Sequence, residues 1–172
     1  GEVVDASFVG ALIGLEVLKK HPGTTMYYDL RSSMIIPEVW NAAGGKAEAC
    51  MVGHALIKKM MKEKGGSYVS ELSQHLYFHD TYDVESSDLS LLYVLEICSR
   101  TGQPLSALIA PFKKYFHSGE INFEIHDKDR VIKALEAKYT ASATKKLQID
   151  GLWLGFDWGW FNVRAINTEP VL

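Results

Sequence analysis

Short apolar segments alternate with helical segments over the first hundred residues of the chain. In the helical segments, apolar residues recur three or four positions apart, as Phe8, Leu12 and Leu15 do. The intervening segments, such as TTMYYDL (24–30), are rich in β-branched and aromatic residues, which is typical of buried strands. Because parallel strands need helical crossovers, this order predicts a three-layer α/β/α domain with a mixed, mostly parallel sheet.

The bounds of the expected elements follow from caps and breakers. Asp5 or Ser7 can cap the first helix, and Ser32 or Ser33 can cap the second. In order, we expect a helix up to HPG (21–23), a strand at 24–30, a helix that ends at Gly44, a strand at 47–52, a helix at 53–66, strands at 67–73 and 75–82, and a helix from about 83 to 100.

The sequence changes in character near His117, which we interpret as a domain boundary. The later elements are a half-buried strand at INFEIH (121–126), a helix at 129–139 capped by Asp127, and strands at 146–150, 152–156 and 160–164. This β-α-β-β-β order predicts a smaller α+β domain over residues 118–172, after an α/β domain over residues 1–117.

Both ends of the sequence look truncated. It opens with GEVVD, which resembles the second half of a hairpin, and it closes on the apolar run PVL. We therefore expect a fragment of a longer protein, in which an open sheet edge of the second, incomplete domain is available for self-association.

Composition and charge restrict the class of partner. The net charge of −3 and the pI near 6.1 argue against a nucleic-acid partner, and we interpret the lysines of segment 58–64 as a solvated face. The apolar stretch 8–18 is too short to span a bilayer and contains Glu16, so we expect no membrane partner and a cytoplasmic location. Cys50 and Cys98 lie in apolar runs, which is typical of buried free thiols in a reducing compartment.

Polar side chains gather where the predicted strands end. They are Arg31, His54, the group Glu71, Ser73 and His75, and the segment RAINTEP (164–170) with Arg164, Asn167 and Thr168. Taken singly, each has a structural interpretation as a surface charge, a helix cap or a loop residue. Together they suit a sugar phosphate, because a guanidinium and neutral donors bind phosphate while a fixed carboxylate accepts hydrogen bonds from vicinal hydroxyls.

Two other kinds of site are disfavoured. Glu71, His75 and His79 have the spacing of metal ligands on a helix, but the LYF segment between the histidines favours a strand. A nucleophile made of Ser73 and His75 lacks the Gly-x-Ser-x-Gly turn, and the two cysteines have no catalytic spacing.

Five motifs, in their order along the chain, resemble the α-D-phosphohexomutases, in the phosphomannomutase/phosphoglucomutase branch. They are YDLR (28–31), like Asp-x-Arg/Lys; VGHALIK (52–58); SELSQH (70–75), like Gly-Glu-x-Ser-Gly-His; SGEIN (118–122); and RAINTEP, like Arg-x-Ser-Asn-Thr-Glu-Pro. The resemblance covers the whole chain and matches the third and fourth domains of that family.

The resemblance implies a function for the longer protein. Such enzymes are isomerases that move phosphate between O1 and O6 of a hexose through a bisphosphate intermediate, with glucose or mannose 1,6-bisphosphate as activator. A phosphoserine and a Mg²⁺ site lie in N-terminal domains that this sequence does not contain. The resemblance implies that Arg31, His54, Glu71, Ser73 and His75 contact the sugar, and that the residues Arg164, Asn167 and Thr168 bind its phosphate.

The sequence also departs from the family pattern. Gln74 stands where the sugar loop usually has glycine, and Ile166 stands where the phosphate loop usually has serine. We expect the isolated chain to be inactive, since the phosphoryl donor and the metal loop are missing. The alternatives are a non-catalytic phosphosugar-binding or regulatory module and, less favoured, a packing domain in which RAINTEP is only a turn.

Overall fold

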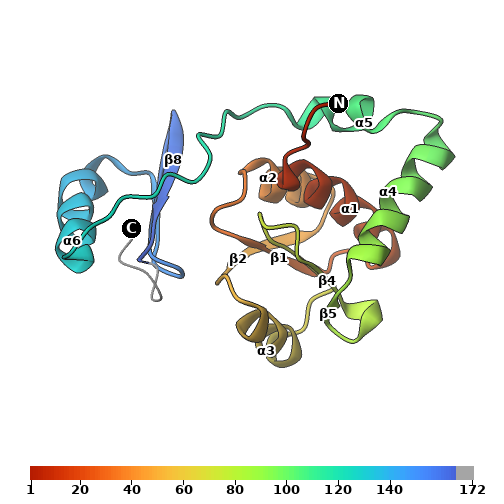
Figure 1. Ribbon diagram of the computed structural model, residues 1–172. Helices are drawn as coiled ribbons and strands as arrows, with labels where there is room; N and C mark the ends of the chain where they lie inside the picture. The colour runs from red at the N-terminus through yellow and green to blue at the C-terminus, as the bar shows by residue number, and fades with distance from the viewer. Residues whose placement is uncertain (166–172) are drawn as a thin grey trace. The chain divides into compact units, whose positions relative to one another are not determined.

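The computed structural model describes residues 1–165 and divides the chain into two compact units, Gly1–His117 and Ser118–Leu172 (Figure 1). Each unit has its own sheet. The two units are therefore described separately.

The first unit is built on a five-stranded mixed sheet in the order β2-β1-β3-β4-β5. β1 runs parallel to both β2 and β3, whereas β4 and β5 are antiparallel to their neighbours. Its elements are α1 (Ala6–Lys20), β1 (Thr25–Asp29), α2 (Ile35–Ala42), β2 (Lys46–Cys50), α3 (His54–Lys64), β3 (Tyr68–Ser70), β4 (Leu76–Phe78), η1 (His79–Thr81), β5 (Val84–Glu85), α4 (Ser87–Thr101), α5 (Leu105–Ile109) and η2 (Ala110–Phe112).

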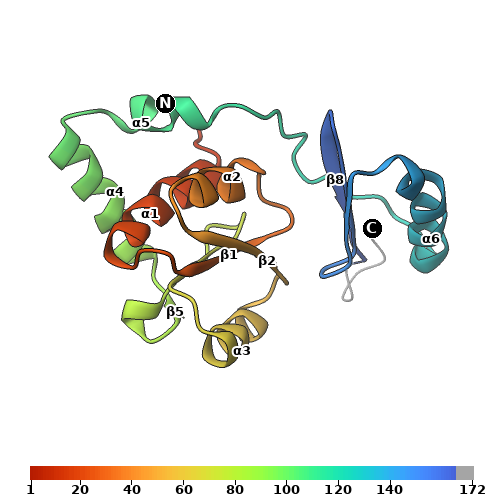
Figure 2. The same cartoon turned by 180° about the vertical axis from the view of Figure 1, so that it is seen from behind.

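Helices cover both faces of this sheet, as the views from the front and from behind show (Figures 1 and 2). Side chains alternate between the faces along each strand. In β1, Met26 packs with α1, α2 and α4 in the larger core, whereas Tyr27 packs with Ile57 and Met61 of α3 in the smaller one. The expectation of a three-layer α/β/α domain with a mixed sheet is confirmed.

Close packing of α1 against α2 depends on Gly14. A Cβ atom at this position would lie 2.2 Å from Nε1 of Trp40, which is fully buried and donates a hydrogen bond to the carbonyl of Ala11 at 3.2 Å. The glycine that ends FVGALIG (8–14) therefore reflects the close packing of the two helices. At the start of α1, the side chain of Asp5 accepts a hydrogen bond from the backbone N–H of Ser7, as expected of an N-cap.

Two expectations for the first unit were wrong in their bounds. The strand predicted at 75–82 ends at Phe78 and continues as the short helix η1. The long helix begins at Ser87 and not near Asp83, because Tyr82 and Asp83 have φ angles of +61° and +59°, which no right-handed helix contains. Ser86 then caps α4 by accepting from the N–H of Leu89.

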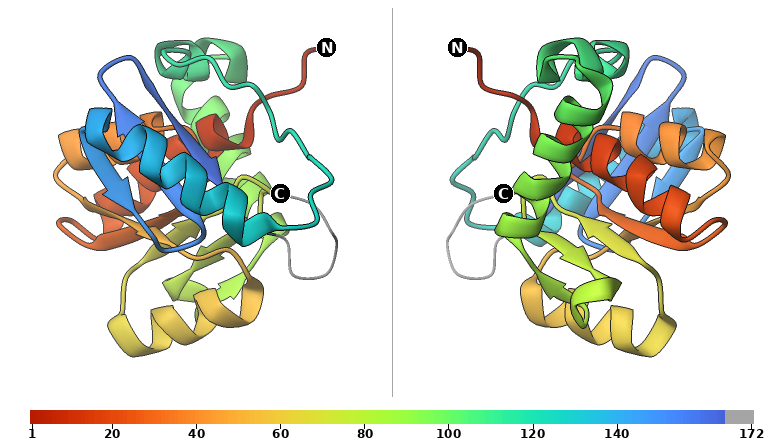
Figure 3. Two further views of the ribbon diagram at one scale, coloured as in Figure 1. Left: turned by 90° about the vertical axis from the view of Figure 1, so that its left-hand side faces the viewer. Right: turned by 90° about the vertical axis from the view of Figure 1, so that its right-hand side faces the viewer.

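The second unit contains a helix and an antiparallel meander in the order β6-β7-β8 (Figure 3). Its elements are α6 (Lys128–Tyr139), η3 (Thr140–Ser142), β6 (Lys145–Leu147), β7 (Leu152–Phe156) and β8 (Gly159–Val163). Asp127 caps α6 as expected, by accepting from the N–H of Arg130 at 3.0 Å.

The strand predicted at INFEIH (121–126) was wrong. Within the described residues this segment has one bridged residue, Glu124, and no continuous strand. Ile121 and Phe123 are 60% and 58% exposed. Alternating apolar residues form a stable strand only where a neighbouring layer buries one face, and these side chains are not buried.

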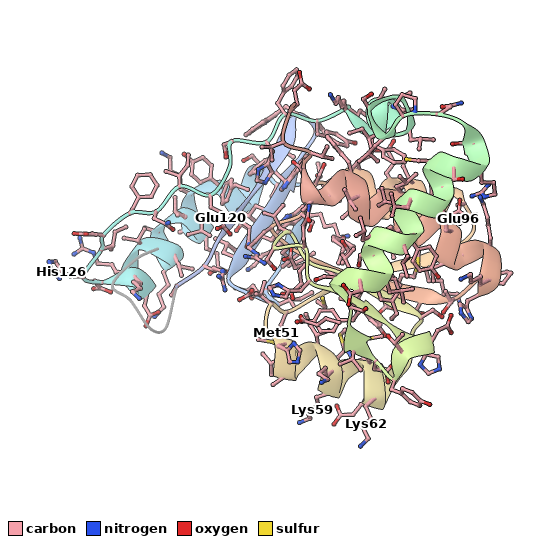
Figure 4. All side chains as sticks on the ribbon, turned by 45° about the vertical axis from the view of Figure 1, so that its right-hand side comes forward. Met51, Lys59, Lys62, Glu96, Glu120 and His126 are labelled. Atoms are coloured by element: carbon pink, nitrogen blue, oxygen red, sulfur yellow. The ribbon has the colours of Figure 1, made fainter. Side chains whose placement is uncertain are left out.

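Among residues 1–165, no helix is long and apolar enough to cross a membrane. The lysines of α3 behave as a solvated face: Lys59 and Lys62 point away from the helix into solvent (Figure 4). One of them, Lys59, lies 3.8 Å from the carboxylate of Glu63 in an exposed ion pair.

Candidate functional site

The carboxyl ends of the three parallel strands lie at one edge of the sheet in the first unit. Asp29 at the end of β1 is in register with Cys50 at the end of β2, and Tyr28 is in register with Ser70 at the end of β3. The polar residues that directly follow these strands are therefore brought together. Open α/β sheets usually bind their ligands at this place, just beyond the carboxyl ends of the strands.

Arg31 follows β1 and is held by the carboxylate of Asp29. Its Nε and Nη2 atoms donate to Oδ2 of Asp29 at 3.1 and 2.6 Å. The Nη2 atom also lies 4.0 Å from Oε1 of Glu71, the residue that follows β3. One guanidinium thus lies between two carboxylates, and 14% of its side chain is exposed.

Glu71 is a buried carboxylate with fixed partners. It is 3% exposed. Its Oε1 accepts from the N–H of Gly53 at 3.4 Å, and its Oε2 accepts from the hydroxyl of Tyr77 at 3.0 Å. Burial, followed by the charge of Glu71, raises the pKa of Tyr77 well above its usual value, so its hydroxyl stays protonated and donates.

Two half-exposed histidines extend this cluster around Glu85 of β5. Nδ1 of His54 lies 3.4 Å from Oε2 of Glu85 and 3.4 Å from the Tyr77 hydroxyl. Nε2 of His75 lies 3.9 Å from the same Glu85 oxygen. The hydroxyl of Ser73 is 2.8 Å from Nδ1 of His75. All five residues predicted to bind the sugar are therefore linked through one set of contacts.

Gln74 lies in the tight loop between β3 and β4 and has φ +66°. The backbone therefore keeps the left-handed conformation that glycine adopts readily, with glutamine in its place. The N–H of Gln74 donates to the carbonyl of Glu71, and the N–H of Glu71 donates to the carbonyl of His75. These two backbone hydrogen bonds close the loop around Gln74.

In the second unit, Arg164 directly follows β8. Its Nη1 atom lies 3.6 Å from Oδ2 of Asp150. Gly151 is essential to this corner, because it has φ +82° and a Cβ atom there would lie 2.3 Å from the carbonyl of Val163. The other predicted phosphate-binding residues, Asn167 and Thr168, lie outside the described residues, as does Ile166.

A family profile described as phosphoglucomutase/phosphomannomutase, alpha/beta/alpha domain III, matches residues 5–115. The chain belongs to this family. The matched range ends two residues before the end of the first unit, so Arg31, His54 and Glu71 all lie within it.

Curated phosphohexomutase relatives match the whole chain. It is 37% identical over 172 residues to the phosphomannomutase of Methanocaldococcus jannaschii and 31% identical to the phosphomannomutase/phosphoglucomutase of Pseudomonas putida. All of this chain is covered in both comparisons, but only 38% of each relative. A solved phosphoglucomutase/phosphomannomutase family protein from Burkholderia thailandensis superposes with a TM-score of 0.86 at 26% identity, covering 99% of this chain and 37% of that one.

No metal centre can be assigned to this portion of the phosphohexomutase fold. Within residues 1–165, no group of three or more His, Cys, Asp or Glu side chains is arranged to hold a metal ion. Glu71, His75 and His79, which have ligand spacing in the sequence, fall on a loop and on η1 with different partners: His79 contacts Asp83 at 2.9 Å. The described residues therefore give no ground for placing a Mg²⁺ ligand among them.

Sequence reasoning missed three residues of the cluster: Asp29, Tyr77 and Glu85. Asp29 could have been found, because a carboxylate two residues before an arginine at a strand end is within reach of it. Tyr77 is one of three apolar or aromatic residues in β4, and nothing in the sequence marks it as polar. Glu85 lies in a two-residue strand that no pattern indicated.

Proposed function

We propose that this chain is the sugar- and phosphate-binding portion of a phosphomannomutase/phosphoglucomutase. In this proposal the first unit, residues 1–117, recognises the hexose ring, and the second, residues 118–172, binds the phosphate that is not reacting. The longer enzyme is an intramolecular phosphotransferase that interconverts hexose 1-phosphate and 6-phosphate through a bisphosphate intermediate.

The observation that carries the proposal is the contact set around Glu71. A carboxylate has about four lone-pair sites, and the hydrogen bonds from Gly53 and Tyr77 use two of them. A pair of adjacent sugar hydroxyls can donate to such an acceptor. Arg31 adds positive charge, while His54, His75 and Ser73 offer donors and acceptors at the exposed side, so ring hydroxyls meet both kinds of group.

Arg164 supplies the phosphate-binding side of the proposal. A guanidinium binds phosphate with two parallel hydrogen bonds, and Asn167 and Thr168 add neutral donors in the same segment. The contact with Asp150 supports this role, because a carboxylate behind an arginine restricts the directions in which its guanidinium can point. Phosphate is a dianion near neutral pH and can compete with the partly buried carboxylate of Asp150 for the guanidinium.

Isothermal titration of mannose 1-phosphate and glucose 1-phosphate tests the binding function. The 172-residue chain should bind both sugars' phosphates, and Glu71→Gln should bind about tenfold more weakly, since hydrogen bonds to a charged group contribute about 1.5–3 kcal/mol. Arg164→Ala should also weaken binding. Lys62→Ala, which removes the same charge from the outer face of α3, is the matched control and should bind as the wild type does.

The catalytic part of the proposal needs a separate assay. We propose that the phosphoserine and the Mg²⁺ site belong to segments of the longer enzyme outside these 172 residues. The 172-residue chain alone should therefore not convert hexose 1-phosphate to 6-phosphate. Turnover by this chain alone would contradict the proposed division of roles. A longer protein that binds the sugar phosphates without turning them over would indicate the alternative, a non-catalytic phosphosugar-binding module.

A further inference from the structure

Asp29 is a charged residue in the interior of the first unit. It ends β1 and is fully buried, with no exposed surface. A buried carboxylate is costly unless its oxygens are fully hydrogen-bonded, and loss of a partner leaves a large penalty. The contacts of Asp29 come from its own strand end and from the loop that follows β3, so this residue joins two of the segments that contribute to the Glu71 cluster.

One oxygen of Asp29 builds the turn after β1. Oδ1 accepts hydrogen bonds from the N–H of Arg31 at 3.1 Å and from the N–H of Ser32 at 2.9 Å. The hydroxyl of Ser32 also donates to it at 2.9 Å. These three donors lie within three residues of Asp29, so Oδ1 has a local, structural role.

The other oxygen makes contacts of a different kind. Oδ2 accepts from Nε and Nη2 of Arg31, and it also accepts from the backbone N–H of Leu72 at 3.1 Å. Leu72 lies next to Glu71 in the loop between β3 and β4, 43 residues along the chain. A single atom therefore fixes the guanidinium of Arg31 and the loop that carries Glu71, Ser73 and His75.

We propose that Asp29, through Oδ2, is a positioning residue that holds Arg31 away from Glu71 and keeps both groups ready for a hexose phosphate. The ligand in this inference rests on the function proposed above. Nη2 of Arg31 is 2.6 Å from Asp29 and 4.0 Å from Glu71. Without the charge of Asp29, Coulomb attraction draws the guanidinium onto Glu71, and the resulting ion pair occupies the acceptor that the sugar hydroxyls need.

Two variants distinguish the role of Oδ2 of Asp29 from that of Oδ1. In Asp29→Asn, the three donors of the turn hold the amide oxygen at the Oδ1 position, so an NH₂ group that cannot accept replaces Oδ2. Arg31 and Leu72 then lose their shared acceptor. Ser32→Ala is the matched control: it removes one donor to Oδ1 and leaves the hydrogen bonds from Arg31 and Leu72 to Oδ2 in place.

The first measurement needs no ligand. In the wild-type chain, the Nε–H proton of Arg31 and the amide proton of Leu72 should exchange slowly with solvent by NMR. Asp29→Asn should speed both exchanges at least about tenfold, while amide protons in the middle of β1 and β3 stay protected. Ser32→Ala should keep both protons protected. General destabilisation would instead speed exchange throughout the unit.

The second measurement is titration with mannose 1-phosphate. Asp29→Asn should bind about tenfold more weakly, and Ser32→Ala should stay within about twofold of the wild type. Equal affinity of Asp29→Asn and wild type would overturn the inference. So would fast exchange of the Arg31 Nε–H in the wild-type chain, a result that decides the matter even if Asp29→Asn does not fold. A wild-type chain that binds no hexose phosphate, yet shows the expected exchange pattern, contradicts the proposed function and supports the coupling by Asp29.

Discussion

Gln74 adopts a backbone conformation that is costly for any residue other than glycine. At φ +66°, an L-residue loses about 1–2 kcal/mol relative to the right-handed region. Glycine avoids most of this cost. It also raises the conformational entropy of the unfolded chain, which cancels about 0.4–1 kcal/mol of the stability gained. Gln74→Gly should therefore raise the free energy of unfolding by about 0.5 kcal/mol, measured by urea denaturation.

A second substitution at the same position tests the cause. Gln74→Val should lower the free energy of unfolding by about 1 kcal/mol or more, because a β-branched residue fits the left-handed region poorly. If both variants had wild-type stability, the loop would have changed conformation and the strain argument would be wrong. This prediction is independent of sugar binding.

Individual residues of the cluster differ in how far the sequence predicts them. Arg31, His54 and Glu71 could be predicted to lie together because each follows a strand, and parallel strands end at one edge of a sheet. Tyr77 could not, because its hydroxyl contacts Glu71 only through the antiparallel return of β4. That contact depends on the register of Val69 with Tyr77, a property of strand pairing that no local pattern encodes.

At the scale of elements, Glu38 of α2 forms hydrogen bonds with two residues of the segment that follows η2. Its carboxylate accepts from the ammonium of Lys114 and from the hydroxyl of Tyr115, the latter at 2.7 Å. The hydrogen bond from Lys114, then that from Tyr115, lowers the pKa of Glu38 below its ordinary value of 4.5. Because the folded pKa is the lower one, the stabilisation is present above pH 4.5 and is lost as the pH falls through the folded pKa.

Thermal unfolding of the wild type and of Glu38→Gln tests whether these hydrogen bonds stabilise the first unit. The variant should have the lower Tm at pH 7, and the difference should shrink toward zero as the pH falls from about 5 to 3. A Tm difference that did not change with pH would show that the charge of Glu38 has no part in it. Glu63→Gln is a suitable control, since Glu63 forms an exposed ion pair with Lys59 on the surface of α3.

The expected elements were right where a segment also had a layer to pack against. The apolar spacing of α1 and the aromatic residues of β1 predicted both elements, and both contribute to the core. In segment 121–126, apolar and polar residues alternate as they do in a strand, but the apolar side chains are exposed. The start of α4 was misjudged because left-handed residues at 82 and 83 stop a helix, and neither tyrosine nor aspartate signals this as glycine does.

For the whole molecule, the two units differ in how much apolar surface they bury. Both apolar core clusters among the described residues lie in the first unit. In the second, the buried apolar residues of residues 118–165 are three neighbours in β7, Leu152, Trp153 and Leu154, and α6 has no fully buried residue. Since burial of apolar surface is the main favourable term in folding, the second unit should be the less stable.

The tryptophans make this difference measurable. Trp153, Trp158 and Trp160 lie in the second unit and only Trp40 lies in the first, whereas most helical residues lie in the first. Fluorescence therefore reports mainly on the second unit and far-UV circular dichroism mainly on the first. In urea, the fluorescence transition should have its midpoint at a lower concentration than the dichroism transition, because the units unfold separately. Coincident midpoints would mean that the chain unfolds as one cooperative body, in which case the small core of the second unit is stabilised by its attachment to the first.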